Sequence, residues 1–171
     1  NSNNQEELNV EVNIGDINFI TIQNKDDSFL RIILENAYPS SEIGEPELPQ
    51  INQLIEIPRE ADIRIDIINN EFIEYNLNEV NPNTKIFPVQ PSLSKSTNPQ
   101  DVDFIYKRDV YNKNHFINND LVKVINKGTL REVEIGNLVV SPFEYNPTTN
   151  ILKVHHKIDF NVHFDNANIS E

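Results

Sequence analysis

The 171-residue chain contains no cysteine, tryptophan or methionine, and only four of its residues are glycine. Without cysteine, the chain can form neither a disulfide nor a thiolate nucleophile. None of the glycines belongs to a phosphate-binding loop motif, and no serine stands in a Gly-x-Ser-x-Gly elbow. The sequence therefore lacks the usual marks of nucleotide binding and of serine or cysteine catalysis.

Positive charge is also scarce, because 27 acidic residues stand against 14 lysines and arginines and leave a formal net charge of −13. Nucleic-acid phosphates and anionic membrane surfaces are both bound by cationic protein surfaces. We therefore expect neither a nucleic acid nor a membrane as a partner. No run of 18 apolar residues is present, so the sequence predicts no membrane-spanning helix.

Apolar and polar residues alternate with a period of two through most of the chain, which is typical of half-buried β-strands. Ile, Val, Leu and Phe occupy the apolar positions, and these residue types pack well on a pleated sheet. The clearest alternating segments are residues 8–14, 17–22, 30–34, 63–67 and 152–164. No stretch longer than about ten residues has a convincing helical period.

Turn-forming residues separate these segments. Ten prolines are spread along the chain, and Asn126–Thr129 and Asn146–Asn150 have the composition of hairpin connections. The pattern predicts an all-β fold, an antiparallel β-sandwich of jelly-roll-like type. We expect a single domain over residues 8–166, with a flexible N-terminal tail over residues 1–7 and a C-terminal tail over residues 167–171.

Carboxylates are numerous, but they do not form a convincing acid–base pair. General acid–base catalysis needs two groups in different environments, one of them with a raised pKa. The candidate pairs stand two residues apart in polar stretches, where both members are expected to face water: Glu45 and Glu47, Asp101 and Asp103, and Glu132 and Glu134. The interpretation of the chain as a glycosidase would be based only on its large number of carboxylates.

The four histidines are His115, His155, His156 and His163. His155 and His163 share a face of the last alternating segment, but they lie about 26 Å apart along a straight strand, beyond the reach of one metal ion. His156 falls in the apolar register of this strand and is expected in the core or at its rim. We expect no metal and no cofactor.

One segment departs from the strand pattern. Residues 88–101 read PVQPSLSKSTNPQD, which predicts a long, extended surface loop with Lys95 between Ser94 and Ser96. Proteases bind substrates as extended strands, and prolines reduce the conformational entropy that a loop loses when it binds. A protruding lysine fits a pocket with a buried carboxylate, although an ordinary exposed lysine explains the same residues.

Three segments, Gly44–Pro49, Leu93–Pro99 and Pro142–Val154, together resemble the N-terminal propeptide of the gingipain family of cysteine proteases, peptidase family C25. The resemblance covers roughly residues 40–165, and G-x-P-x-L-P and Y-N-P-x-T-x-x-L are its more specific motifs. Their residues, for which it implies a structural role, are Gly44, Pro46, Leu48, Pro49, Tyr145, Asn146 and Pro147.

The resemblance implies a non-catalytic β-sandwich that inhibits a cysteine protease and assists its folding. Its partner would be the catalytic domain downstream in the same precursor, exported by a bacterium to the cell envelope or outside. A basic residue of one loop enters the specificity pocket in this family, and Lys95 matches it by its position before Asn98 and Pro99. The implied inhibitory loop is Leu93, Ser94, Lys95, Ser96 and Thr97.

A β-sandwich adhesion or carbohydrate-binding module of an exported protein is the alternative. Such a module would place exposed aromatic rings on one face for stacking on sugars. With no tryptophan and five tyrosines, the chain offers few residues for that platform.

Overall fold

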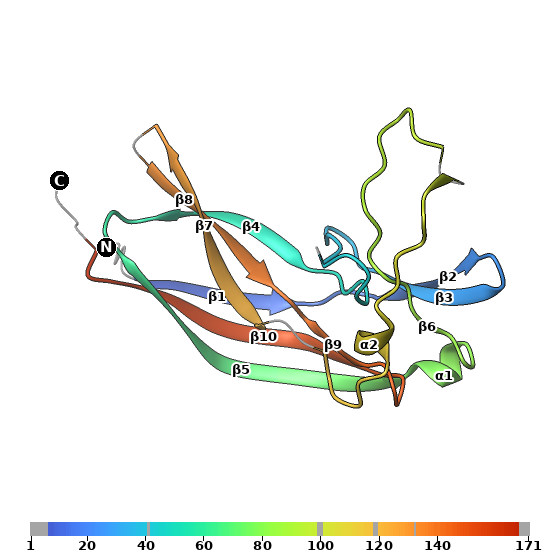
Figure 1. Cartoon of the computed structure of the whole chain (residues 1–171). Coiled ribbons are helices and arrows are strands. Elements are labelled where there is room, and N and C mark those ends of the chain that lie inside the picture. Colours follow the sequence, from blue (N-terminus) through green and yellow to red (C-terminus); the bar gives the residue numbers. More distant parts are fainter. Residues whose placement is uncertain (1–6, 41, 99–100, 118–119, 132, 168–171) are drawn as a thin grey trace.

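The computed structural model describes residues 7–40, 42–98, 101–117, 120–131 and 133–167 (Figure 1). These residues form mainly β-strands, with two helices of four residues each. In chain order the elements are β1 (Glu7–Asn13), β2 (Asn18–Asn24), β3 (Asp27–Ile33), β4 (Ile51–Ile57), β5 (Asp62–Asn76), α1 (Leu77–Val80), β6 (Lys85–Ile86), α2 (Arg108–Tyr111), β7 (Val122–Leu130), β8 (Val133–Val140), β9 (Phe143–Asn146) and β10 (Ile151–Asp165).

The strands of the described residues form three sheets. In the first sheet, β10 lies between β1 and β5 and also pairs with β9, always antiparallel. In the second, β2 and β3 form a hairpin, and the two residues of β6 pair with β3 in parallel. In the third, β8 lies antiparallel between β4 and β7. The predicted all-β, antiparallel architecture is confirmed.

Two hydrophobic cores share the first sheet. The third sheet covers one end, where Ile57, Leu138 and Val140 belong to the same buried cluster as Phe160 and Val162. At the other end, a second cluster joins the second sheet, the start of β10 and the motif segments; its members include Leu30, Leu48, Ile86, Phe143, Tyr145 and Leu152. The predicted buried face of the last strand is confirmed, and this strand connects both cores.

A register shift between His155 and Lys157 interrupts the alternation of β10. The His155 side chain is buried as a result, with its ring nitrogens 2.7 Å from Asn70 Oδ1 and 3.1 Å from Glu144 Oε1. His156 lies at the rim, where its side chain is 40% exposed. Periodicity alone does not reveal that His155 is the more deeply buried of the two.

The two predicted hairpin connections have different outcomes. Asn146–Asn150 joins β9 to β10, as predicted. The prediction for Asn126–Thr129 is wrong, because these residues lie inside β7 and form a bulge opposite β8. Asn126 Oδ1 accepts a hydrogen bond from the amide of Gly128, whose φ is +112°. The turn-forming residues therefore build a bulge, and the chain reverses near Arg131.

At each end of the chain, the structure describes one residue of a predicted tail. β1 begins at Glu7, so the first sheet includes the last residue of the predicted N-terminal tail. Ala167, the first residue of the predicted C-terminal tail, packs against the core below the third sheet. Residues 1–6 and 168–171 lie outside the described residues.

The close approach of Gly136 to its neighbours gives a test of core packing. A Cβ at this position would lie 2.6 Å from Cδ1 of Ile57 and 2.9 Å from Cγ1 of Val124. We expect Gly136→Ala to lower the free energy of unfolding by about 1–3 kcal/mol, as overpacking does. Gly15→Ala is the control, because nothing lies within 4 Å of its added Cβ. Equal urea midpoints for the two variants would contradict the packing shown here.

Burial of His155 predicts a pH dependence of stability. Burial lowers the pKa of His155, against the opposing effect of the Glu144 carboxylate. The unfolded state therefore binds this proton first as the pH falls below about 6.5, and the folded state loses stability. We expect His155→Gln to lose less stability than the wild type between about pH 7 and pH 5 in urea titrations. His115→Gln, at an exposed position, should keep the wild-type pH dependence; the same behaviour for both variants would refute the prediction.

Candidate functional site

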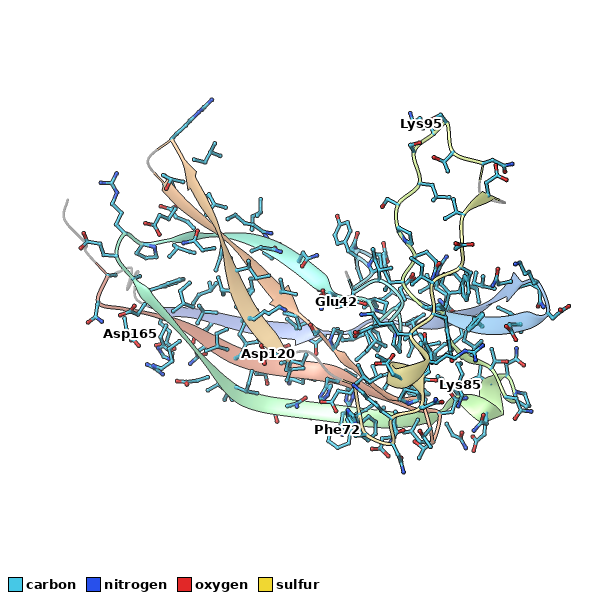
Figure 2. The ribbon with its side chains drawn as sticks, viewed as in Figure 1. Glu42, Phe72, Lys85, Lys95, Asp120 and Asp165 are labelled. Carbon is cyan, nitrogen blue, oxygen red and sulfur yellow. The ribbon has the colours of Figure 1, made fainter. Side chains whose placement is uncertain are left out.

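The predicted loop joins β6 to α2 and projects away from the sheets, with Lys95 at its tip (Figure 2). Its first residues, Pro88 and Val89, are buried, whereas residues 92–98 are exposed. Pro99 and Gln100 lie outside the described residues. The site is therefore a projection on the surface of the domain.

The loop base is held by the segment Gly44–Pro49, some 45 residues earlier in the chain. On the outgoing arm, the Gly44 amide donates to Val89 O at 2.8 Å, and the Val89 amide donates to Glu45 O at 2.9 Å. On the returning arm, the Lys107 amide donates to Gly44 O at 3.0 Å. The Gln90 side chain joins the arms, because it donates to Ile105 O at 2.8 Å and accepts from Ile105 N at 3.0 Å.

Glycine suits the centre of this base better than other residues. Gly44 has a φ of +83°, in the left-handed region that side chains disfavour. A Cβ there would also lie 3.0 Å from Cγ of Lys107 and 3.1 Å from Cγ2 of Ile105. The rest of the motif fixes the segment: Pro46 forms a bridge with Pro88, and both Leu48 and Pro49 are buried.

The tip of the loop is a tight turn. The Thr97 amide donates to Ser94 O at 3.0 Å, and the Ser94 hydroxyl lies 2.7 Å from the Thr97 hydroxyl and 3.1 Å from that of Ser96. The expectation of an extended loop is therefore wrong at the tip, because the hydroxyl side chains close a turn around Lys95. In the described part of the chain, nothing forms an ion pair with the exposed Lys95 ammonium.

Aromatic rings and ion pairs surround the loop base. Phe104 contacts both Phe29 and Phe87, with ring centroids 5.5 and 5.8 Å apart. The Arg31 guanidinium lies 4.6 Å from the centre of the Phe87 ring and 2.8 Å from Glu47. Burial raises the pKa of Glu47, and Arg31 opposes this effect. These contacts make the base a packed part of the domain.

The candidate acid–base pairs do not form a catalytic site. Glu45 pairs with Lys107 at 3.0 Å, while Glu47 pairs with Arg31, so each carboxylate holds the loop base. Asp101 and Asp103 are exposed. Glu132 lies outside the described residues, and its neighbour Glu134 is half-buried in β8. Each observed position therefore suits a structural or solvated carboxylate.

The motif around Tyr145 supports the strand that leads into the loop. The buried Tyr145 hydroxyl donates to Asn150 Oδ1 at 2.6 Å and accepts from the amide of Ile86 at 3.4 Å. Asn150, with a φ of +58°, donates from its side chain to Thr84 O at 2.9 Å. Asn146 Oδ1 accepts from the amides of both residues after Pro147 and closes the hairpin turn. The motif thus acts through the core, away from the Lys95 tip.

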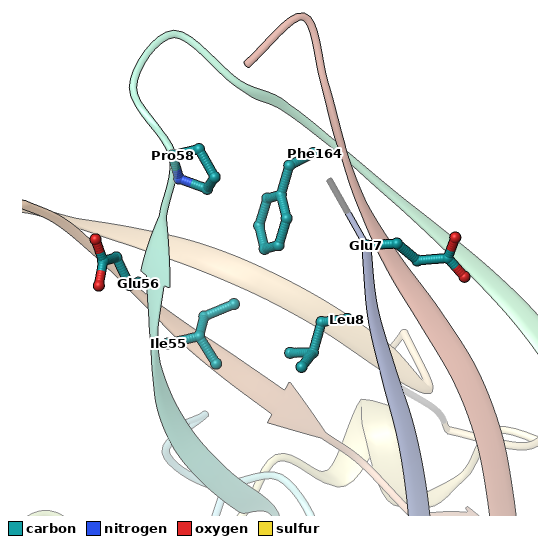
Figure 3. A pocket seen from close by; sticks show the side chains of 6 residues that line it. All are labelled: Glu7, Leu8, Ile55, Glu56, Pro58 and Phe164. Carbon is teal, nitrogen blue, oxygen red and sulfur yellow. The ribbon is translucent and has the colours of Figure 1, made fainter. Parts of the chain in front are cut away.

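A pocket between β4 and β1 has a cavity volume of about 400 Å³ (Figure 3). Leu8, Ile55 and Phe164 line it, whereas the carboxylates of Glu7 and Glu56 point away from it. No group of three or more His, Asp or Glu side chains in the described ranges could hold a metal ion. No helix among these residues is long and apolar enough to cross a membrane.

The carbohydrate-binding alternative has little support in the distribution of aromatic rings. Among the described residues, the exposed aromatic side chains are Tyr38 and Phe72. Tyr38 precedes β4 and bridges to Gln50, while Phe72 lies on β5, in a different sheet. They do not form a row on one face.

Tyr145 provides a test of the structural role of its motif. Tyr145→Phe would remove the hydroxyl and leave buried polar atoms of Asn150 and Ile86 without this partner. We expect the free energy of unfolding to fall by about 1–3 kcal/mol in urea titrations. Tyr38→Phe, whose ring is 60% exposed, should change it little. A Tyr145→Phe variant as stable as the control would show that the hydroxyl network contributes nothing.

The chain is similar to known proteins along nearly its whole length. The family model Propeptide_C25 matches residues 1–170. Lys-gingipain of Porphyromonas gingivalis is 30% identical over 166 residues, which are 97% of this chain and 10% of that protein. Gingipain R2 of the same organism is 24% identical over 118 residues, 69% of this chain and 15% of that protein. The chain therefore spans about a tenth of the Lys-gingipain that it matches.

Two solved structures have a similar fold. One concerns the zymogenic latency of gingipain K from P. gingivalis; its matching chain has a TM-score of 0.88 and 30% identity, covering 96% of this chain and 90% of that one. The other is a complex of the pro- and mature domains of RgpB, with a TM-score of 0.82 and 20% identity over 97% and 84% of the two chains. Since the family model matches nearly the whole sequence, this chain belongs to the C25 propeptide family.

Proposed function

We propose that this propeptide keeps a gingipain-like cysteine protease latent by placing Lys95 in the S1 pocket of the catalytic domain. The domain itself is non-catalytic, as a member of a propeptide family. The observation that carries the proposal is the exposed Lys95 ammonium at the tip of a loop whose two arms are hydrogen-bonded to the rest of the domain. An acidic pocket offers that ammonium the carboxylate that it lacks here.

The geometry of the loop suits an inhibitor better than a substrate. Its base is held by backbone hydrogen bonds on both arms, so little conformational freedom remains to be lost on binding. The turn at Ser94–Thr97 keeps the backbone around Lys95 out of the extended form that proteases bind. A lysine presented in this way fills the pocket while its peptide bonds stay poorly placed for attack.

The relatives support lysine as the inhibitory residue. The proteins at 30% identity are named Lys-gingipains, whereas the matching gingipains R1 and R2 are 23–24% identical over a shorter part of the chain. The partner would be the catalytic domain downstream in the same precursor, which the propeptide would also help to fold. We place this precursor in the cell envelope or outside a bacterium.

Lys95→Ala tests the role of the ammonium. We expect the intact domain to inhibit the peptidase domain of its own precursor at about nanomolar concentration. The substitution should weaken inhibition by about 1.5–3 kcal/mol, the size of a charge-assisted contact, measured as the inhibition constant against a lysyl substrate.

Lys113→Ala is the matched control, because Lys113 is also exposed but follows α2 instead of lying on the loop. It should inhibit like the wild type. Unchanged inhibition by Lys95→Ala would remove Lys95 from this role, and equal losses in both variants would point to a general effect of charge.

A further inference from the structure

The β7–β8 hairpin is a second projection of the domain. In Figure 1 its tip and the Lys95 loop rise on the same side of the molecule, with β4 between them. Figure 2 shows Lys95 at the tip of one projection. A partner that receives Lys95 and extends along this side of the domain would therefore face the hairpin at the other end.

The register of the third sheet defines an apolar outer face near this hairpin. Leu54 and Ile125 both pair with Asn137, and Leu130 pairs with Val133, so these side chains point to one face. The opposite face packs into the core through Val122, Leu138 and Val140. The exposed fractions are 65% for Leu54, 40% for Ile125 and 65% for Leu130.

By the same register, Asn137 and Glu56 also lie on this outer face. The outer face of such a sheet is commonly polar, so the exposed apolar residues among them stand out. Val133 and Ile135 are half-buried and lie between the exposed residues on β8, in neither buried core. Contiguous exposed apolar residues mark interaction sites in soluble domains. We call Leu54, Ile125, Leu130, Val133 and Ile135 the hairpin face.

Charges of both signs border the hairpin face. Residues 121–131 contain Lys123, Lys127 and Arg131 and no acidic residue, whereas Glu56 on β4 pairs with Ile135 of the face itself. Lys127 stands in the β7 bulge, and Arg131 stands at the turn. A complementary partner surface is apolar and places acidic groups opposite β7 and the turn.

We propose that the hairpin face binds the same peptidase domain as Lys95, at an apolar patch outside the substrate cleft with acidic groups opposite β7. This inference rests on the proposed function. A stable interface buries about 800 Å² on each partner, with about 20 to 30 residues a side, and the described loop tip of residues 92–98 is too short to supply that area alone. Two contacts on one side of the domain fix the orientation of the loop and let Lys95 enter its pocket from one direction.

The test uses the whole domain with Leu54→Asn and Leu130→Asn combined. The matched control is Ile68→Asn on β5, because Ile68 is 64% exposed and lies on the first sheet. Urea titrations establish that both variants are folded. We expect the double variant to raise the inhibition constant about tenfold to hundredfold, as the loss of interface anchors does, and the control to leave it unchanged.

A second measurement separates the two contacts. A lysyl chloromethyl ketone alkylates the catalytic cysteine and fills the S1 pocket, so binding to this blocked peptidase cannot use Lys95. We expect weakened but measurable binding of the wild type, equal binding of Lys95→Ala, and about tenfold or greater loss for the double variant.

The outcomes distinguish the two proposals. If Lys95→Ala weakens inhibition but the double variant does not, the hairpin face is not a docking site and the proposed function stands. If the double variant weakens inhibition and Lys95→Ala does not, the hairpin face docks while the S1 role fails. A wild-type dimer in sedimentation velocity that the double variant dissociates would overturn the proposed occupant, since a second copy would then cover the face.

Discussion

The orientation of the Lys95 loop depends on one short stretch of backbone. Gly44 and Glu45 bond to Val89 on one arm and to Lys107 on the other, so both arms are fixed to a segment that belongs to neither. A Cβ at Gly44 would crowd the side chains of the returning arm, and the positive φ disfavours other residues there. The exposed tip therefore stands on a base whose backbone polar groups are satisfied within the domain.

Ion pairs near this base fix the positions of neighbouring segments more than they raise the free energy of unfolding. Glu47 is partly desolvated beside Arg31, and the cost of its burial offsets much of the attraction between the two charges. Removing one partner alone would leave the other poorly solvated. The acidic residues of the G-x-P-x-L-P segment thus hold β3 and the returning arm against the motif.

Strand β10 joins the two ends of the domain, which carry different elements. β10 carries residues of both cores and pairs with β1, β5 and β9, so the two halves of the sandwich share one backbone. The second sheet and the loop lie at one end, and the β7–β8 hairpin lies at the other (Figure 1). Because the third sheet uses its inner face for the core, only its outer face is free to contact a partner.

The sequence by itself determined the strand-rich architecture, the buried face of β10, the hairpin at Asn146–Asn150 and the exposure of the Lys95 segment, since alternation and turn chemistry are local properties. Tertiary structure decided what depends on contacts between distant residues. The bulge in β10 selects His155 for burial, the pairing of β7 with β8 converts the Asn126–Thr129 turn sequence into a bulge, and Gly44 meets the loop arms only in the folded chain. Pairing and packing between strands that are distant in the sequence override local preference at these positions.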